Sequence, residues 1–476
     1  MKNIKIHLQA LLLAVALGTV SCKKLVEEPI AFVQPEDFYT TPSQIEATFA
    51  AAMNRVWDYW GGYGYGMGNF IHDDQYAGGD LVITANHGSD MWNRHYAAIL
   101  NLNSAIRAME NGNLGSSATQ EEVDVLMGQA KMIRGWNYFM LVRMFGELPL
   151  IDQNTEDPIN AEIGRAPIAD VYALIVSDLT EAAAKLPATW DQFPGRPTSG
   201  AAKGLLAKAY LTMATYPLND PSNYAKAADY AKQVMDEGIY SLVPNINNVF
   251  STPTKYGPEM MWSLNSNYAD INTDPQIYKP GRLDGWGDFS VQIEWEQSIP
   301  ETPRKQAYVL TELDGVHYTQ WPDDQRPFIK KFMYDTEDDY NNFSSVMNMP
   351  IIRYADVLLI YAEATNMASA GATAPQEAVD AINQVIDRAN GYANLPQHPL
   401  LTTAMSKADF DAAVIEERNQ ELCFEFDRWF DLVRKRILQQ ESIPAIQQNF
   451  SEEDYLFPIP ENDVELGKGI TQNPGY

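Results

Sequence analysis

Aromatic and polar side chains gather in two stretches of the chain. The first stretch contains Tyr59, Trp60, Tyr63, Tyr65, Asp73, Asp74, Trp92 and Asn93. The second contains Asn265, Tyr268, Tyr278, Trp286, Trp295 and Trp321. Flat rings can cover the apolar C–H face of a sugar, and carboxylates and amides can bond its hydroxyls, since an unpaired buried hydroxyl costs about 1–3 kcal/mol. The same residue types fill protein cores, so each loop tryptophan is open to either interpretation.

Catalytic and metal-binding motifs are weak by comparison. The chain has no G-x-S-x-G elbow, no H-E-x-x-H and no phosphate-binding loop. Glycoside hydrolysis needs only two carboxylates, and pairs such as Glu294 and Glu296 arise by chance among 63 acidic residues. The acids of 335–339 alternate as in a calcium loop, but Tyr340 stands where an EF-hand needs glycine. We therefore predict no catalytic residue, no cofactor and no metal.

Composition and charge exclude several classes of protein. The 476 residues include 45% hydrophobic residues, which excludes wholesale disorder. The formal net charge of -29 repels polyanions, and no run of Lys and Arg offsets it, so nucleic-acid binding is not expected. The two cysteines exclude a disulfide scaffold and a multi-cysteine zinc site.

The N-terminus reads as a secretory signal. Lys2 and Lys5 precede an apolar stretch over 10–20, which is too short to span a bilayer of about 30 Å. We predict that residues 1–21 are removed and that Cys22 is the lipid-modified first residue of a bacterial lipoprotein. A multi-chain lipid anchor would attach such a protein stably to a membrane. An ordinary secreted protein with an incidental cysteine is the alternative.

Apolar spacing predicts a mainly α-helical protein. Ile45, Phe49, Met53 and Val56 recur at steps of three and four residues and would share one helix face. Other predicted helices cover 92–109, 121–145, 168–186, 198–216, 222–237, 353–370, 374–389, 408–423 and 427–439. No convincing run of alternating strands is present. Trp57 and Trp136 continue helical apolar stripes and are predicted to lie in the core.

Two features of this pattern bear on architecture. Alanines in 198–216 and 222–237 suggest tetratricopeptide-like helical hairpins with a repeat of about 34 residues. Two long stretches, 61–91 and 240–350, interrupt the helices. Loops longer than about 12–15 residues are usually functional or disordered, and these are too rich in Trp and Tyr for disorder. We therefore expect the ligand-binding surface in these stretches.

Four blocks in the same order resemble the SusD family, also called RagB/SusD, whose members are surface glycan-binding lipoproteins of Gram-negative nutrient-uptake systems. The blocks read GQAKMIRGWNYFMLVRMFGELPLI at 128–151, RYADVLLIYAEA at 353–364, ERNQELCFEFDRWFDLVR at 417–434 and FPIPENDVELGKGITQNPGY at 457–476. A departure occurs at Thr302-Pro303-Arg304, where the family often has Asp-Pro-Arg.

The resemblance implies a SusD-like fold over 22–476, with a helical scaffold at about 40–240 and 350–440. A loop-rich region at about 240–350 and a C-terminal segment at 440–476 would complete it. The implied function is non-catalytic capture of an oligosaccharide or polysaccharide at the cell surface and delivery to a SusC-like TonB-dependent outer-membrane transporter. Capture of peptides by the same kind of lid, or an all-α glycoside hydrolase, remains an alternative.

Under this resemblance, the predicted glycan contacts are Tyr63, Tyr65, Asp73, Asp74, Trp92, Asn93, Tyr278, Trp286, Trp295 and Trp321. Tyr63 and Tyr65 could instead contact the transporter.

A dense charged cluster surrounds Trp429 and Phe430 and is predicted to be a structural ion network. Its members are Glu417, Arg418, Glu421, Glu425, Asp427 and Arg428. Asp356 is predicted to pair with Arg353 at a spacing of three.

Overall fold

The computed structural model describes residues 38–57, 75–76, 85–156, 163–266, 277–322, 324–333, 348–441, 450–466 and 469–476. Residues 39–476 form one compact unit, to which the elements below belong. No helix among the described residues has the length and apolar character needed to cross a membrane. The predictions at Cys22 and in the signal segment lie outside the described residues.

The predicted helices are confirmed, although α5 begins at Ala85, seven residues before the predicted start and inside the stretch expected to interrupt the helices. They are α3 (Pro42–Trp57), α5 (Ala85–Glu110), α6 (Gln120–Phe145), α7 (Ile168–Lys185), α8 (Ser199–Met213), α9 (Asn223–Glu237), α14 (Tyr354–Ala368), α15 (Gln376–Ala389), α16 (Lys407–Glu421) and α17 (Arg428–Lys435). Two short helices, α11 (Ile293–Ser298) and α12 (Pro303–Tyr308), lie in the loop-rich part. Helix α17 stops earlier than predicted because Arg436 adopts a left-handed conformation, and α18 (Leu438–Glu441) follows.

Helix α6 shows how local sequence sets these boundaries. Thr119 and Glu122 form a capping box at its start, with the Glu122 amide donating to Thr119 Oγ1 at 3.2 Å. Its last turn is closed by Gly146, whose φ of 75° suits glycine. Between these ends, Gly135 lets Leu179 of α7 approach, because an added Cβ would lie 3.2 Å from the Leu179 side chain. Trp136 is buried, which confirms its assignment to the core.

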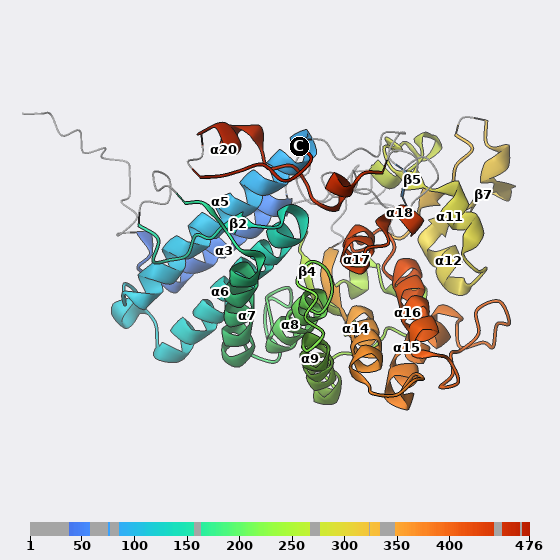
Figure 1. Cartoon of the computed structure of the whole chain (residues 1–476), viewed down its shortest axis with the longest axis horizontal. Helices are drawn as coiled ribbons and strands as arrows, with labels where there is room; N and C mark the ends of the chain where they lie inside the picture. Colours follow the sequence, from blue (N-terminus) through green and yellow to red (C-terminus); the bar gives the residue numbers. More distant parts are fainter. Residues whose placement is uncertain are drawn as a thin grey trace, which may run out of the picture. The chain divides into compact units, whose positions relative to one another are not determined.

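Successive helices pack against one another in hairpins (Figure 1). Helix α6 contacts α5 and α7, α8 contacts α7 and α9, and α14 contacts α9, α15 and α16. The alanines predicted at close-packing positions in α8 are buried, including Ala201, Ala202, Ala207 and Ala209. Helix α14 thus joins the N-terminal hairpins to the C-terminal helices in one core.

Short strands are present where none were expected. Strand β4 (Met260–Leu264) pairs antiparallel with β10 (Met349–Arg353), and Trp262 lies opposite Ile352. Both strands are almost wholly buried, so they lack the alternation of apolar and polar residues that reveals a strand in sequence. Other two-residue strands pair as β1 (Gln75–Tyr76) with β5 (Ser290–Val291), β2 (Leu148–Pro149) with β3 (Arg165–Ala166), β6 (Val309–Leu310) with β9 (Phe328–Ile329), and β7 (Glu312–Leu313) with β8 (Val316–His317).

A buried ion network, centred on Arg353 and Glu421, ties β4, β10, α12, α14, α15 and α16 together. Arg353 Nη1 lies 2.8 Å from Glu259 and 2.7 Å from Glu421, and its Nε lies 2.8 Å from Glu425. Arg388 and Arg304 add further bonds to Glu421, at 2.7 and 3.1 Å. The predicted structural ion network is confirmed for Glu417, Arg418, Glu421, Glu425 and Asp427.

The predicted pair between Asp356 and Arg353 is wrong. Arg353 precedes the first turn of α14 with an extended backbone, φ −134°, so its side chain does not follow the helical spacing. Asp356 pairs instead with Arg418 at 2.6 Å and Lys208 at 3.0 Å. At the Thr302-Pro303-Arg304 departure, Thr302 caps α12 by accepting from the Lys305 amide.

The C-terminal segment lies along the end of α6. The Phe457 amide donates to Met144 O at 2.8 Å, and Asn473 Nδ2 donates to Phe145 O at 3.0 Å. Phe457 also packs edge-to-face on Trp429 at 5.4 Å. These contacts join residues far apart in the chain to the same core.

Candidate ligand-binding groove

An open groove of about 520 Å³ lies between α3, α6, the end of β4 and the loop that precedes α8. These elements can be followed in Figure 1. The residues lining the groove are Glu46, Phe49, Ala50, Met53, Asn54, Gln129, Ile133, Phe193, Pro194, Gly195, Arg196, Pro197, Tyr256, Trp262, Leu264 and Asn265. Its volume falls in the range of sites that hold small-molecule ligands, about 300–1,000 Å³.

The loop before α8 is held in place by several hydrogen bonds. Trp190 Nε1 donates to Pro197 O at 2.7 Å, and Asn265 Nδ2 donates to Gly195 O at 2.9 Å. A Cβ on Gly195 would lie 2.6 Å from the end of the Asn265 side chain, so a larger residue would displace that carboxamide and its bond to Gly195 O. These hydrogen bonds therefore fix the loop as part of the groove wall.

Phe193 is the most unusual residue of this loop. Its side chain is 64% exposed, and its backbone has a φ of 58°. A bulky residue in this left-handed region costs on the order of 1–2 kcal/mol. The guanidinium of Arg196 lies 5.0 Å from the centroid of the Phe193 ring and 5.0 Å from that of Trp190. Strained conformations of this kind cluster at functional sites, and here the strain presents an exposed ring at the groove.

A second ring stands at the groove on another element. Tyr256 is 41% exposed, and the ammonium of Lys255 lies 5.2 Å from its ring centroid. Lys255 Nζ also donates to Ser266 O at 2.7 Å, which anchors this turn to the end of β4. The groove thus carries two accessible aromatic rings, on segments that are far apart in the sequence.

Polar groups line the groove between these rings. Asn265 is fully engaged, since its Oδ1 accepts from Ser263 Oγ at 3.0 Å and Asn348 Nδ2 at 3.1 Å. Asn54 is exposed on α3. Gln129 of α6 is only 4% exposed, and its Nε2 atom has no hydrogen-bond partner among the described residues. The groove therefore offers a mixture of satisfied and unsatisfied amides.

Charge in the groove wall is balanced. The charged residues among its lining side chains are Glu46 and Arg196, which pair at 2.9 Å. The groove contains one described carboxylate, whereas the usual glycosidase mechanism needs two. Among the described residues, no group of three His, Cys, Asp or Glu side chains could hold a metal ion.

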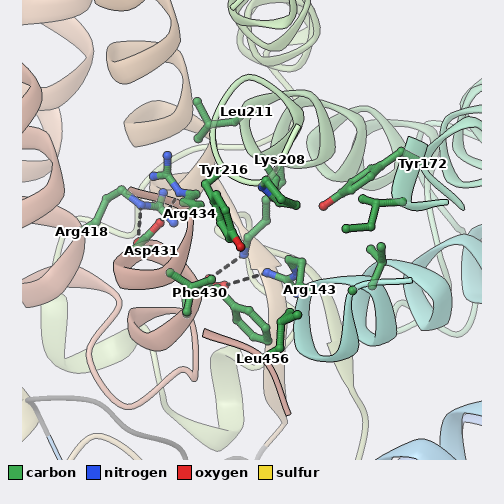
Figure 2. Close-up of a pocket in the computed structure, with 17 residues that line it drawn as sticks. Arg143, Tyr172, Lys208, Leu211, Tyr216, Arg418, Phe430, Asp431, Arg434 and Leu456 are labelled. Carbon is green, nitrogen blue, oxygen red and sulfur yellow. Dashed lines mark hydrogen bonds and ion pairs between the residues drawn. The ribbon is translucent and has the colours of Figure 1, made fainter. Parts of the chain in front are cut away.

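A second cavity, shown in Figure 2, has different chemistry. Its volume is only about 50 Å³, enough for a few water molecules. Its charged side chains pair with one another: Arg418 Nε lies 2.8 Å from Asp431, and Lys208 lies 2.5 Å from Asp427. Arg143 lies 3.8 Å over the ring of Phe430. This cavity belongs to the buried ionic scaffold and is too small for a sugar.

The structure corrects four predicted site residues by burying them. Trp92 packs on Tyr96 at 4.8 Å and on Phe145 at 5.0 Å. Tyr278 is fully buried against Phe289 and Phe332. None of the rings of Trp92, Tyr278, Trp295 and Trp321 is available as an exposed platform for a ligand.

Trp295 and Trp321 show why sequence could not reveal this burial. Trp295 Nε1 donates to Asn419 Oδ1 of α16 at 3.1 Å. Trp321 is stacked on Phe328 at 6.2 Å, the guanidinium of Arg282 lies 4.8 Å from its ring, and its Nε1 donates to Val316 O. Each indole N–H thus has an internal acceptor, on α16 for Trp295 and five residues away for Trp321, and the distant Arg282 covers the Trp321 ring.

The other predicted contacts fall into two groups. Tyr63, Tyr65, Asp73 and Asp74 lie outside the described residues. Asn93 is exposed on α5, and Trp286 is 48% exposed in the turn between Tyr278 and β5.

The pair Glu294 and Glu296 does not form a carboxylate site. Glu294 is exposed, whereas Glu296 is buried. Glu296 accepts from Tyr318 OH at 3.1 Å and pairs with Lys305 at 2.9 Å. Both interactions are internal to the loop-rich part of the fold.

Sequence reasoning missed Gln129, Phe193 and Tyr256. Asn265 was included in the second aromatic stretch and does line the groove. A signal for Phe193 was present in the run Phe193-Pro194-Gly195-Arg196-Pro197, where an aromatic residue stands in a turn-forming sequence. Gln129 carries no such signal, because its burial depends on helices that meet only in the fold.

Comparison with known proteins gives consistent results along the chain. A model of the SusD family matches residues 269–476, and a second model, described as "Starch-binding associating with outer membrane", matches 66–211. A SusD-like protein P2 from Formosa agariphila is 28% identical over 537 residues, covering all of both chains.

Solved structures share the fold. A SusD superfamily protein from Parabacteroides distasonis superposes with a TM-score of 0.78 at 26% identity, covering 91% of this chain and 99% of that one. A laminarin-binding SusD-like protein superposes with a TM-score of 0.73 at 22% identity, covering 92% of this chain and all of that one. On these grounds the chain belongs to the SusD family.

Proposed function

We propose that this protein is a non-catalytic glycan-binding lipoprotein that captures an oligosaccharide or polysaccharide in the groove between α3 and α6. The observation that carries the proposal is one groove that contains both Phe193, exposed in a strained conformation, and Gln129, a buried amide with no partner for its nitrogen among the described residues. Strain and unsatisfied polar groups lower stability, so their presence together at a groove favours a ligand-binding role.

The groove has the chemical features that a sugar requires. Phe193 and Tyr256 offer flat apolar faces for the C–H side of a pyranose ring, and Asn54 and Gln129 offer amides for its hydroxyls. The groove is open to solvent and not an enclosed cavity, which suits a chain that extends beyond the site. The family that residues 66–211 match is described as starch-binding, and a structural neighbour of the same fold is described as laminarin-binding.

Binding without turnover agrees with the groove's charges. Glu46 is the one carboxylate among the described lining residues, and Arg196 pairs with it. A general acid and a second carboxylate, either as base or nucleophile, would both be needed for hydrolysis of a glycosidic bond.

The family supports a proposal for the location and the partner of this protein. We propose lipid attachment at Cys22, placement at the outer membrane facing the exterior, and delivery of the glycan to a SusC-like TonB-dependent transporter. Protease shaving of intact cells tests the exposure: loss of the protein supports it, and full protection contradicts it. Co-purification of a large outer-membrane β-barrel protein with the native lipoprotein tests the partner, and its consistent absence contradicts delivery through such a complex.

A binding screen tests the central function. The chain from Lys23 onward is titrated with soluble starch, laminarin, polygalacturonate and a mixed peptide pool, and reducing-sugar release is measured in the same samples. We expect binding of at least one polysaccharide without release of reducing ends. Turnover would place the protein among enzymes, and binding of peptides alone would overturn the glycan assignment.

A further inference from the structure

Gln129 is a buried amide with unusual surroundings. It lies on α6, whose backbone is fixed by the capping box at Thr119 and by packing on α7. Its side chain is 4% exposed and lines the groove, and its Nε2 has no hydrogen-bond partner among the described residues. An unsatisfied buried polar group of this kind costs about 1–3 kcal/mol, so its retention calls for an explanation.

The neighbouring polar groups do not supply the missing partner. The Asn265 carboxamide is engaged with Gly195, Ser263 and Asn348. Glu46 and Arg196 pair with each other at 2.9 Å. The amide nitrogen is itself enclosed, so the Gln129 carboxamide must turn toward the groove before an oxygen of a bound molecule can accept its hydrogen bond.

The groove's charge indicates the class of that molecule. Glu46 and Arg196 cancel, and the remaining lining side chains are neutral. The whole chain carries a formal net charge of -29, which repels anions at long range. A uronic acid or a sulfated sugar would therefore find no unpaired cation in the described wall to offset the loss of its hydration.

We infer, on the basis of the proposed function, that the groove binds an uncharged oligosaccharide and that Gln129 is a specificity-determining residue that hydrogen-bonds a hydroxyl of the bound sugar. Phe193 and Tyr256 position sugar rings by their faces, which are similar among hexoses. Gln129 instead contacts one oxygen at one position, so it discriminates between sugars that differ at that hydroxyl. Such a site rejects an analogue lacking the hydroxyl, because the amide is then left unpaired.

The test compares two matched variants, Gln129→Met and Gln292→Met. Gln292 is also buried, 3% exposed, with an Nε2 that has no partner among the described residues, but it does not line the groove. Methionine keeps the length and flexibility of glutamine without its amide. Each protein is titrated calorimetrically with maltoheptaose, laminarihexaose and oligogalacturonate, and thermal unfolding is measured without ligand.

We expect the wild type to bind a neutral probe and not oligogalacturonate. Gln129→Met should weaken that binding about 10-fold or more, and its melting temperature without ligand should be unchanged or higher because an unsatisfied amide is removed. Gln292→Met should bind like the wild type. A merely structural Gln129 would instead lower the melting temperature without a specific loss of affinity.

The outcomes separate this inference from the proposed function. Unchanged affinity of Gln129→Met for the neutral probe, or preferential binding of oligogalacturonate by the wild type, overturns the inference and leaves glycan binding intact. Failure of the wild type to bind any saccharide overturns both. If Gln129→Met does not fold, Gln129→Leu is measured against Gln292→Leu with the same criteria.

Discussion

The buried ion network around Arg353 and the groove beside Gln129 treat polar groups in opposite ways. Arg353 Nη1, Nε and Nη2 donate to Glu259, Glu421 and Glu425, and to the Glu421 carbonyl, at 2.6 to 2.8 Å. In the groove, Gln129 Nε2 is buried and has no partner among the described residues. The aromatic rings differ likewise: Trp321 is covered on its faces, whereas Phe193 is exposed.

The comparison shows what distinguishes scaffold from site in this protein. Charge density alone does not mark a functional site, because the densest cluster of ionisable groups is closed and buried, and its carboxylates are paired with cations. Strain or an unpartnered polar atom alone does not mark one either, since Phe424 and Phe426 beside Glu425 have φ of 63° and 67°, and Arg388 Nε has no partner among the described residues. The groove combines these two features with an exposed aromatic ring and a cavity of about 520 Å³.

Removing Arg353 from the buried ion network should lower the free energy of unfolding strongly. Arg353→Leu removes the one cation that bonds Glu259, Glu421 and Glu425 together, although Arg388 still bonds the first two and Lys331 still bonds the third. Losses of about 3–5 kcal/mol are typical when one partner of a buried ion pair is removed. Urea denaturation monitored by far-UV circular dichroism measures the change. The matched control is Lys232→Ala, which breaks the exposed pair with Asp236 and should leave stability unchanged. Similar curves for both variants would contradict the scaffold role of the network.

Replacing Trp321 should affect stability and spare binding. Trp321→Ala removes a ring that is 1% exposed and packed between Phe328 and Arg282, which should cost about 3–5 kcal/mol locally. Limited proteolysis of the 277–333 region reports this loss. Affinity for the glycan that the wild type binds should be unchanged. A weakened affinity with normal stability would restore Trp321 as a ligand contact.

As pH falls, protein stability should decrease first through His95, in the core near the groove, and only at lower pH through the buried carboxylate of Glu363. Burial lowers the pKa of His95 from 6.5 to about 4, despite its hydrogen bond with Asn137. Between these two pKa values the His95 ring is protonated in the unfolded chain and neutral in the folded chain. The free energy of unfolding therefore falls as pH drops from 6.5 to 4, by about 1.4 kcal/mol per unit of pKa shift. The His95 ring packs on Trp136, which packs on Trp262 of the groove wall.

Glu363 of α14, which forms buried ion pairs with Arg434 and Lys435 of α17, responds at lower pH. Burial raises the pKa of Glu363, but Arg434 and Lys435 outweigh it and lower the pKa to about 2. This stabilisation is present above the ordinary pKa of 4.5 and is lost as pH falls toward 2. Unfolding free energies measured in pH steps should therefore show a slope between about pH 6.5 and 5.5, above the range where carboxylates take up protons, that His95→Phe removes and Glu363→Gln retains. A slope in that window that survives His95→Phe would contradict the assignment.

The smallest expected stability effect belongs to Phe193. Phe193→Ala removes an exposed ring, so the melting temperature should change little. Its binding free energy for an oligosaccharide should weaken by about 1–3 kcal/mol, by analogy with the range known for nucleic-acid bases stacked on aromatic side chains. Leu400→Ala, at another exposed apolar position, provides the control and should bind normally. Equal affinities for Phe193→Ala and the wild type would remove the ring from the site.

The sequence allowed much of the scaffold to be predicted. Helices such as α6 and α15 follow from apolar spacing and caps, and the clustered charges of 417–428 indicated the ion network. Strands β4 and β10 were not predicted, because both are buried and show no alternation of apolar and polar residues. The ion-pair partner of each charged residue was not predicted either, since Arg353 bonds residues that lie up to 94 positions away.

The site was harder to predict for the same reason. Exposure of an aromatic residue depends on neighbours that the sequence does not place: Trp321 is covered by Arg282, whereas Phe193 stays exposed in its loop. The orphaned amide of Gln129 is visible only once α3 and α6 are brought to the groove. Composition could therefore suggest sugar chemistry without locating it.

The most direct test of the account is a crystal structure of the protein with the oligosaccharide that it binds best in the screen. The account predicts sugar rings against Phe193 and Tyr256, with one hydroxyl within hydrogen-bonding distance of the Gln129 carboxamide. Ordered sugar at another surface, such as that around Trp286, with the groove free of ligand, would contradict it.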